Sequence, residues 1–293
     1  RIPHEQKDLF AWPLVEKAAM PAGVTLEFQT DSETLELMTD PFPNRSPVDL
    51  FSDGKFHSSV TSSERDRIGF RNLGSHTKEI KIWLPQHGEF RFKGLNMSGS
   101  AVISKASSKN FPEWITYGSS ITQCRDAKSP SVTWPSIVAR SNDLALTCLG
   151  YGGNCHLDPM IARMIRDSEA DLISLCLGIN IYAYSSLNQR TFQPGIFAFI
   201  EILREKHKTV PVIVISPIYA AKDNAETTPN EVGFTLQGMR REIKEAVDIL
   251  NYLGDENVFY LDGLSIFDKA QAHLLHDEII HNLGSTHHAQ IGH

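Results

Sequence analysis

The sequence predicts an antiparallel β-sandwich domain followed by an α/β domain built as a three-layer, doubly wound parallel sheet. Two patterns carry this prediction. In residues 23–102, short segments alternate apolar and polar side chains, which is typical of strands with one face in water. From residue 111 onward, continuous apolar runs alternate with helical patterns, as expected for buried parallel strands joined by helices. A polar run at 104–110 predicts a linker, so we expect domains at 1–108 and 109–293.

The first domain is predicted to be almost entirely strand, with Gly, Pro, Asn and Asp at the breaks between segments. Its clearest period of two is EIKIWL at 79–84, and its one predicted helix is short, near Leu14–Ala19. The predicted strands are VTLEFQT (24–30), TLELMTD (34–40), KFHSSVT (55–61), RIGFRNL (67–73), KEIKIWLP (78–85) and GEFRFKGLNM (88–97).

The second domain is predicted to alternate strands with helices. Its clearest helix carries apolar residues at Met239, Ile243, Val247 and Leu250, and Gly254 marks its end. The predicted strands are EWITYG (113–118), DLALTCLG (143–150), ADLISLCLGIN (170–180), TVPVIVISPIY (209–219) and NVFYLDG (257–263). The predicted helices are TWPSIVARS (133–141), DPMIARMIRDSE (158–169), GIFAFIEILREKH (195–207) and TLQGMRREIKEAVDILNYLG (235–254).

Bulk composition narrows the functional classes. The chain of 293 residues has a net charge of −7 and a pI near 5.9, so it lacks the positive charge that attracts a nucleic acid. Its longest apolar stretch, 210–221, contains prolines and is shorter than the ~20 residues of a membrane-spanning helix. The four cysteines include no CxxC pair, which predicts a reducing compartment, and we expect a cytoplasmic protein. The sequence does not specify an oligomeric state.

Ligands bind open α/β sheets at the carboxyl ends of the strands, so the residues there are candidates for a site. The run WITYG is followed by Ser119 and Ser120, and LALTCLG is followed by the glycine-rich turn YGGN. The run DLISLCLGI is followed by Asn180. A serine, a turn with free backbone N–H groups and an amide side chain are parts of an acyl-transfer site.

A carboxylate–histidine pair near the C-terminus completes that set. Glu278 and His281 in EIIH are three residues apart, close enough for the carboxylate to orient the imidazole. A histidine held in this way can take the proton of a serine hydroxyl, which is otherwise a weak nucleophile. The tail is rich in histidine, but no HExxH or comparable ligand spacing is present. We therefore expect neither a metal nor an organic cofactor.

These residues resemble the four sequence blocks of the SGNH/GDSL family of esterases and acyltransferases. YGSSIT is similar to the GDSIT block, which implies Ser120 as the nucleophile and its N–H as an oxyanion-hole donor. LGYGGN is similar to the second block, which implies Gly153 as a backbone donor, and LGIN to the third, which implies Asn180 as the side-chain donor. EIIHN is similar to the final DxxHP block, which implies His281 as general base with Glu278 in the aspartate's place.

The chain departs from the family pattern in the first, third and last blocks. In the third block, Ile181 replaces the aspartate that often follows the asparagine. Ser119 replaces the usual aspartate beside the nucleophile, a side chain that does not attack the substrate. In the last block, Asp277 is an alternative to Glu278 as the partner of His281. The pair of Glu278 and His281 is preferred because His287 then falls where the family often has a later histidine.

The N-terminal segments, with VDLFSDGKF at 48–56 among them, resemble the carbohydrate-binding-module-like sandwich of one subgroup of this family. That subgroup acts on acylated sugars or transfers acyl groups in aromatic polyketide tailoring. We therefore expect serine-dependent hydrolysis of a small acyl ester, on an acetylated sugar or a glycosylated metabolite. The alternatives are acyl transfer to an acceptor hydroxyl in secondary metabolism, thioester hydrolysis, and an inactive carbohydrate-binding protein. The polar loop Lys222–Glu231 is expected near the site and to influence substrate choice.

Overall fold

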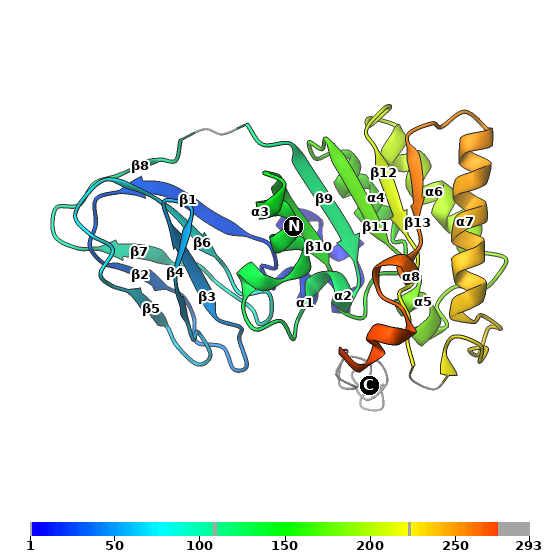
Figure 1. Ribbon diagram of the computed structural model, residues 1–293, viewed down its shortest axis with the longest axis horizontal. Coiled ribbons are helices and arrows are strands. Elements are labelled where there is room, and N and C mark those ends of the chain that lie inside the picture. The colour runs from blue at the N-terminus through cyan, green and yellow to red at the C-terminus, as the bar shows by residue number, and fades with distance from the viewer. Residues whose placement is uncertain (1, 108–109, 222–223, 275–293) are drawn as a thin grey trace. The chain divides into compact units, whose positions relative to one another are not determined.

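Two antiparallel sheets make up the N-terminal part of the computed structural model (Figure 1). The structure describes residues 2–107, 110–221 and 224–274. One sheet has the strand order β4-β3-β6-β1-β8 and the other the order β5-β2-β7. The strands are β1 (Thr25–Thr30), β2 (Leu35–Met38), β3 (Val48–Ser52), β4 (Lys55–Val60), β5 (Arg67–Phe70), β6 (Lys78–Trp83), β7 (Gly94–Met97) and β8 (Ile103–Lys105).

Inward-facing residues of both sheets form one hydrophobic core, which confirms the predicted sandwich. Phe28 and Ile80 come from the first sheet, Leu37 and Ile68 come from the second, and all four are buried in the same cluster. Buried and partly exposed residues alternate along most of β6. The period of two that predicts this strand therefore arises because one of its faces packs on the core.

The strands β3 and β8 differ from the predicted set, and β7 covers only the end of the predicted segment 88–97. The residues of β3 from Val48 to Phe51 are all buried, so this strand lacks the alternation of a half-exposed strand. The strand β8 is exposed and pairs with β1 at the edge of its sheet. Because β8 includes Ser104 and Lys105, the linker predicted at 104–110 is wrong at its start.

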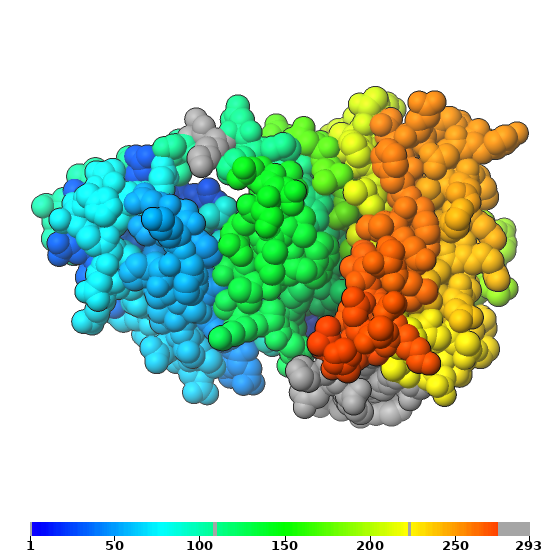
Figure 2. Space-filling model, viewed as in Figure 1, coloured from blue at the N-terminus to red at the C-terminus, as the bar shows by residue number. Residues whose placement is uncertain are grey.

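Five strands form the sheet of the C-terminal part, in the order β10-β9-β11-β12-β13. Hydrogen-bond registers show that β9, β11, β12 and β13 run parallel to one another. The strands are β9 (Glu113–Gly118), β10 (Ala145–Gly150), β11 (Leu172–Cys176), β12 (Val212–Ile215) and β13 (Val258–Leu261). β9 is buried along nearly its whole length, as its continuous apolar run predicts. β13 is an edge strand, and the orange segment that contains it lies on the molecular surface (Figure 2).

Helices separate these strands along the chain, which confirms the predicted α/β class. The helices are α1 (Trp12–Ala18), α2 (Ser120–Gln123), α3 (Trp134–Ser141), α4 (Pro159–Arg166), α5 (Ile179–Tyr184), α6 (Phe192–Arg204), α7 (Leu236–Tyr252) and α8 (Gly263–Ile266). Short 3-10 helices lie at His4–Leu9, Pro130–Val132 and Lys269–Leu274. The predicted apolar face of α7, with Met239, Ile243 and Val247, is buried. Within the described ranges, no helix combines the length and apolar character needed to cross a membrane.

The chain divides into two compact units, each of which is discontinuous in sequence. The first contains Arg1–Lys7, Ala11–Pro112 and Gln123–Leu149, and the second contains Asp8–Phe10, Glu113–Thr122 and the chain from Gly150 onward. The predicted domain boundary between residues 108 and 109 stays a prediction.

Within the first unit, a buried carboxylate ties β3 to a segment far along the chain. Asp49 lies fully buried on β3. Its Oδ2 accepts hydrogen bonds from Ser129 Oγ at 2.5 Å, from Ser131 Oγ at 2.6 Å and from Ser131 N–H at 3.0 Å. Three hydrogen bonds to one buried oxygen therefore fix residues 129–131 against β3.

Candidate functional site

The predicted nucleophile block lies where β9 ends and the short helix α2 begins. Gly118 is the last residue of β9, and Thr122 N–H donates to Ser119 O at 3.1 Å to close the turn. A β-carbon at Gly118 would lie 2.1 Å from Thr122 Oγ1 and 3.0 Å from Cys176 Cβ. No side chain fits between these neighbours, so the sharp strand-to-helix turn requires glycine at this position.

The two serines after this glycine have different environments. Ser119 is 1% exposed, and its Oγ accepts a hydrogen bond from Ile121 N–H at 3.2 Å. It therefore satisfies a backbone donor at the start of α2, as serine commonly does at a helix N-terminus. Ser120 is only half-buried, so it is the more exposed of the two serines. This contrast supports the choice of Ser120 over Ser119 as the reactive serine.

The glycine-rich turn after β10 lies directly beside the nucleophile turn. Tyr151 N–H donates to Gly118 O at 2.8 Å, and Asn154 N–H closes the turn on Tyr151 O at 2.9 Å. Gly153 has φ +75°, in the left-handed region that favours glycine. A β-carbon at Gly153 would also lie 3.1 Å from Tyr184 Oη. The dihedral angle therefore favours glycine here, and the neighbouring hydroxyl leaves little room for a β-carbon.

Asn180 lies on α5, which follows β11 after the turn residue Gly178. Gly178 has φ +107°, and a β-carbon there would lie 2.7 Å from Pro217 Cγ. The side chain of Asn180 is fully buried, and its Oδ1 accepts a hydrogen bond from Cys155 N–H at 3.0 Å. Its Nδ2 is buried and has no hydrogen-bond partner among the described residues. An unsatisfied buried donor destabilises a fold by about 1–3 kcal/mol, so a buried amide without a partner calls for a functional explanation.

Three of the four predicted blocks therefore meet at one edge of the sheet. The contact of Tyr151 with Gly118 joins the second block to the first, and the contact of Cys155 with Asn180 joins the second to the third. This edge is the carboxyl end of the parallel strands, where ligands of such sheets bind. The predicted base His281 and its candidate partners Glu278 and Asp277 lie outside the described residues, so their roles stay predictions.

Cys155, beside Asn180, is unsuited to nucleophilic attack. Cys155 is 1% exposed, and burial raises the pKa of its thiol far above the usual value. The neutral thiol is a poor nucleophile compared with the thiolate. Burial likewise raises the pKa of the neighbouring Tyr117, which keeps this hydroxyl protonated. Neither Cys155 nor Tyr117 is therefore suited to act as the nucleophile.

One histidine of the site was not singled out from the sequence. His156 Nε2 lies 3.0 Å from Gly153 O, and its Nδ1 lies 2.8 Å from Ser186 Oγ. The His156 ring also packs edge-on against Tyr184, with 5.7 Å between the ring centroids. The sequence signal for this residue is its place in GGNCH, three positions after the predicted oxyanion glycine.

The loop after β12 contacts the helix that carries Asn180. Tyr182 Oη donates to Thr228 O at 3.0 Å, and Asn230 Nδ2 donates to Tyr182 O at 2.9 Å. Glu226 anchors the loop through both of its carboxylate oxygens, which accept from the Arg240 guanidinium at 2.6 and 2.9 Å. These contacts place residues 226–230 against α5, and the predicted influence of the loop on substrate choice stays a prediction.

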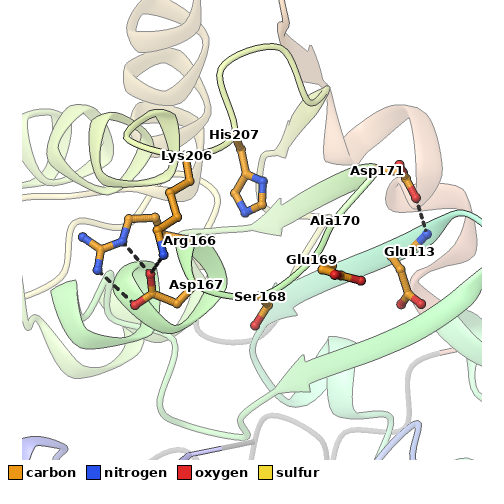
Figure 3. A pocket seen from close by; sticks show the side chains of 9 residues that line it. All are labelled: Glu113, Arg166, Asp167, Ser168, Glu169, Ala170, Asp171, Lys206 and His207. Atoms are coloured by element: carbon orange, nitrogen blue, oxygen red, sulfur yellow. Dashed lines mark hydrogen bonds and ion pairs between the residues drawn. The ribbon is translucent and has the colours of Figure 1, made fainter.

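An open, charged pocket of about 440 Å³ lies at the opposite end of the strands (Figure 3). Glu113 begins β9 on this pocket, whereas Gly118 ends β9 at the candidate site. Burial, followed by the nearby Glu169 and Asp171, raises the pKa of Glu113. The pocket is lined by Glu113, Arg166, Asp167, Ser168, Glu169, Ala170, Asp171, Lys206 and His207. This pocket contains none of the predicted site residues and lies at the amino edge, away from the usual ligand position.

In the part of the chain that the structure describes, no group of three or more His, Cys, Asp or Glu side chains is placed to hold a metal ion. The four cysteines are free thiols.

Comparison with known families identifies the C-terminal part of the chain. Residues 113–292 match the model of the GDSL-like lipase/acylhydrolase family. Among curated protein sequences, none matches the chain.

Solved structures resemble the chain over both its N-terminal and C-terminal parts. A salicylyl-acyltransferase from a tetracycline biosynthetic pathway is 30% identical, covers 91% of this chain and 78% of its own, and has a TM-score of 0.83. A Bacteroides ovatus protein described as a GDSL-like lipase is 21% identical, with 88% and 79% coverage and a TM-score of 0.71. A family two carbohydrate esterase from Clostridium thermocellum is 15% identical, with 82% coverage of each chain and a TM-score of 0.64. The last two likenesses concern the fold alone.

Proposed function

Because the chain belongs to the GDSL-like lipase/acylhydrolase family and is a serine ester hydrolase or acyltransferase, we propose that it forms an acyl-enzyme on Ser120. The observation that carries this proposal is the Asn180 amide, whose Nδ2 is buried without a partner among the described residues. Its Oδ1 is already engaged by Cys155 N–H at 3.0 Å, so the donor end faces away from that contact. A preorganised donor of this kind stabilises the negative oxygen of a tetrahedral intermediate.

The proposed reaction begins when His281 takes the proton of the Ser120 hydroxyl and Ser120 Oγ attacks the ester carbonyl. Glu278, or Asp277 in its place, orients the imidazole and stabilises its charge. The oxyanion accepts hydrogen bonds from Asn180 Nδ2 and from the N–H groups of Gly153 and Ser120. As the C–O bond breaks, the alcohol leaves with the proton from His281. A water molecule then gives a proton to His281 and attacks the acyl carbon. As the bond to Ser120 Oγ breaks, His281 returns this proton to Ser120 and the acid is released.

The proposed substrate is a small acyl ester on a sugar or a glycosylated metabolite. The neighbouring carbohydrate esterases support this substrate class by analogy of fold only. Acyl transfer is the second candidate, because the salicylyl-acyltransferase is 30% identical over 91% of this chain. Both reactions share the acyl-enzyme, and they differ in whether water or an acceptor hydroxyl attacks it.

The first test is intact-mass analysis after treatment with a fluorophosphonate, which phosphonylates activated serines. We expect one adduct per chain on the natural protein and on Ser119→Ala, and none on Ser120→Ala. Ser119→Ala is the matched control because it removes the neighbouring hydroxyl, which caps α2. An adduct that persists in Ser120→Ala, or no adduct on the folded natural chain, would contradict the nucleophile assignment.

The second test separates hydrolysis from transfer. The natural chain is incubated with para-nitrophenyl acetate, with and without a glycoside acceptor, and both free acetate and acetylated glycoside are quantified. Free acetate as the main product in both conditions indicates hydrolysis. Acetylated glycoside formed at the expense of acetate indicates transfer, and the enzyme would then be an acyltransferase.

A further inference from the structure

The backbone at Gly153 needs an external constraint if its N–H is to act as a preorganised donor. Glycine gives this position its left-handed dihedral of φ +75°. It also leaves the peptide planes on either side more free to rotate than any other residue would. A donor that must reorient during the reaction contributes less than one already in place, because preorganisation avoids that reorganisation.

The peptide plane before Gly153 is fixed by the side chain of Asn154. Asn154 Nδ2 donates to Gly152 O at 2.8 Å. Gly152 O and the Gly153 N–H belong to the same planar trans peptide, so they point in opposite directions. A hydrogen bond that holds the carbonyl on the Asn154 side therefore holds the Gly153 N–H on the opposite side.

The peptide plane after Gly153 is fixed by the side chain of His156. Its Nε2 lies 3.0 Å from Gly153 O, which can only accept, so Nε2 carries the proton and donates. The Nδ1 lies 2.8 Å from Ser186 Oγ, a hydroxyl that can donate to the neutral ring or accept from the protonated one. Nε2 thus donates to Gly153 O in both protonation states. Edge-on packing against Tyr184 at 5.7 Å further restricts the ring.

The same short segment also connects the two predicted oxyanion donors. Cys155, between the two clamping residues, donates its N–H to Asn180 Oδ1 at 3.0 Å. Ser186, the partner of His156, follows α5, the helix that carries Asn180. Movement of the Gly153 turn would therefore disturb contacts of both donors.

From these contacts we infer that His156 and Asn154 are positioning residues, which clamp the peptides on both sides of Gly153 and thereby aim its N–H at the substrate oxygen. This inference rests on the function proposed above. Neither side chain takes part in proton transfer. Their effect is to raise kcat by holding a transition-state donor, with little effect on KM.

The test compares His156→Gln with His156→Asn on para-nitrophenyl acetate. The Gln amide nitrogen can lie near the position of Nε2 and donate to Gly153 O, whereas the Asn amide reaches only the position of Nδ1. We expect His156→Asn to lose about 10- to 100-fold in kcat with little change in KM. We expect His156→Gln to retain most of the natural kcat. Thermal melting of both variants checks that they are equally folded.

Equal kcat values in the two variants, whether both natural or both reduced, would overturn the inference, because the donor at Nε2 would then make no difference. If His156→Asn does not fold, Asn154→Ala decides the question by the same measurement. A kcat loss of about 10-fold or more there supports the inference, and an unchanged kcat overturns it. Fluorophosphonate labelling keeps this result distinct from failure of the proposed function. If the natural chain is not labelled, both proposals fail. If the natural chain is labelled but kcat is unchanged in the variants at His156 and Asn154, only the positioning inference fails.

Discussion

Replacement of Asn180 by alanine should reduce catalysis strongly and stability little. Removal of one oxyanion-hole donor typically lowers kcat by about 10²- to 10³-fold, or about 3–4 kcal/mol of transition-state stabilisation. The effects on folding largely cancel. Cys155 N–H loses its acceptor, at a cost of about 1–3 kcal/mol, while removal of the unpartnered buried Nδ2 relieves a penalty of the same size, about 1–3 kcal/mol. Loss of packing around the shortened side chain offsets part of that gain.

The assay measures kcat and KM on para-nitrophenyl acetate together with the free energy of unfolding in urea. Ser174→Ala is the matched control, because Ser174 is a buried polar residue of β11 whose hydrogen bonds are satisfied. It accepts from Trp114 Nε1 at 3.0 Å and donates to Thr116 Oγ1 at 2.9 Å. We expect this control to lose about 1–3 kcal/mol of stability and to keep its kcat. A folded Asn180→Ala protein with kcat within about threefold of the natural value would refute the reasoning, since a donor in the hole is worth far more.

Three further predictions concern stability. Burial lowers the pKa of His87 from 6.5 to about 4. Between these values the unfolded chain binds a proton that the folded chain does not, so stability falls as the pH drops from 6.5 toward 4. We expect the decrease in unfolding free energy from pH 7 to pH 4.5, measured in urea, to be about 2 kcal/mol smaller in His87→Gln than in the natural chain. The exposed control His76→Gln should show the same decrease as the natural chain. Equal decreases in the two variants would contradict the assignment. Arg240→Met should lower the free energy of unfolding by about 3–5 kcal/mol, because it leaves Glu226 partly buried without its partner. The added change Glu226→Gln should recover part of that loss, and no recovery would argue against the charge as its cause. Gly118→Ala should lower the free energy of unfolding by about 1–3 kcal/mol and also reduce kcat, because the β-carbon of the alanine meets neighbours on two sides. A variant with the stability and kcat of the natural chain would show that the turn adapts.

The elements with a strong period were predictable from the sequence, and those without one were not. The helix α7 carries buried residues at helical spacing, and β6 alternates buried with partly exposed residues. The strand β3 is buried on four successive residues and β8 on none, so neither displays the period of an amphipathic strand. Periodicity records contact with a single core face, and it disappears when a strand is wholly buried or wholly exposed.

Within the candidate site, the proximity of the three blocks was predictable and the orientation of their side chains was not. The sequence motifs indicated Ser120, Gly153 and Asn180, and the structure places their three blocks at one edge of the sheet. That Ser119 caps α2 while Ser120 remains half-buried depends on the turn geometry. The contact of His156 with Gly153 O depends on side-chain direction, which a sequence pattern cannot encode.

The cluster around Asp49 has a consequence for the order in which the protein folds during its synthesis. Ser129, which donates a hydrogen bond to Asp49, is synthesised 80 residues after it. Until then, burial of β3 would leave Asp49 without these donors, which is costly for a buried polar group. By that time β9, a strand of the second unit, has already been made. The nascent chain must therefore keep its first sheet incomplete while part of the next one emerges, and a fragment that ends at residue 108 would lack Ser129 and Ser131 altogether.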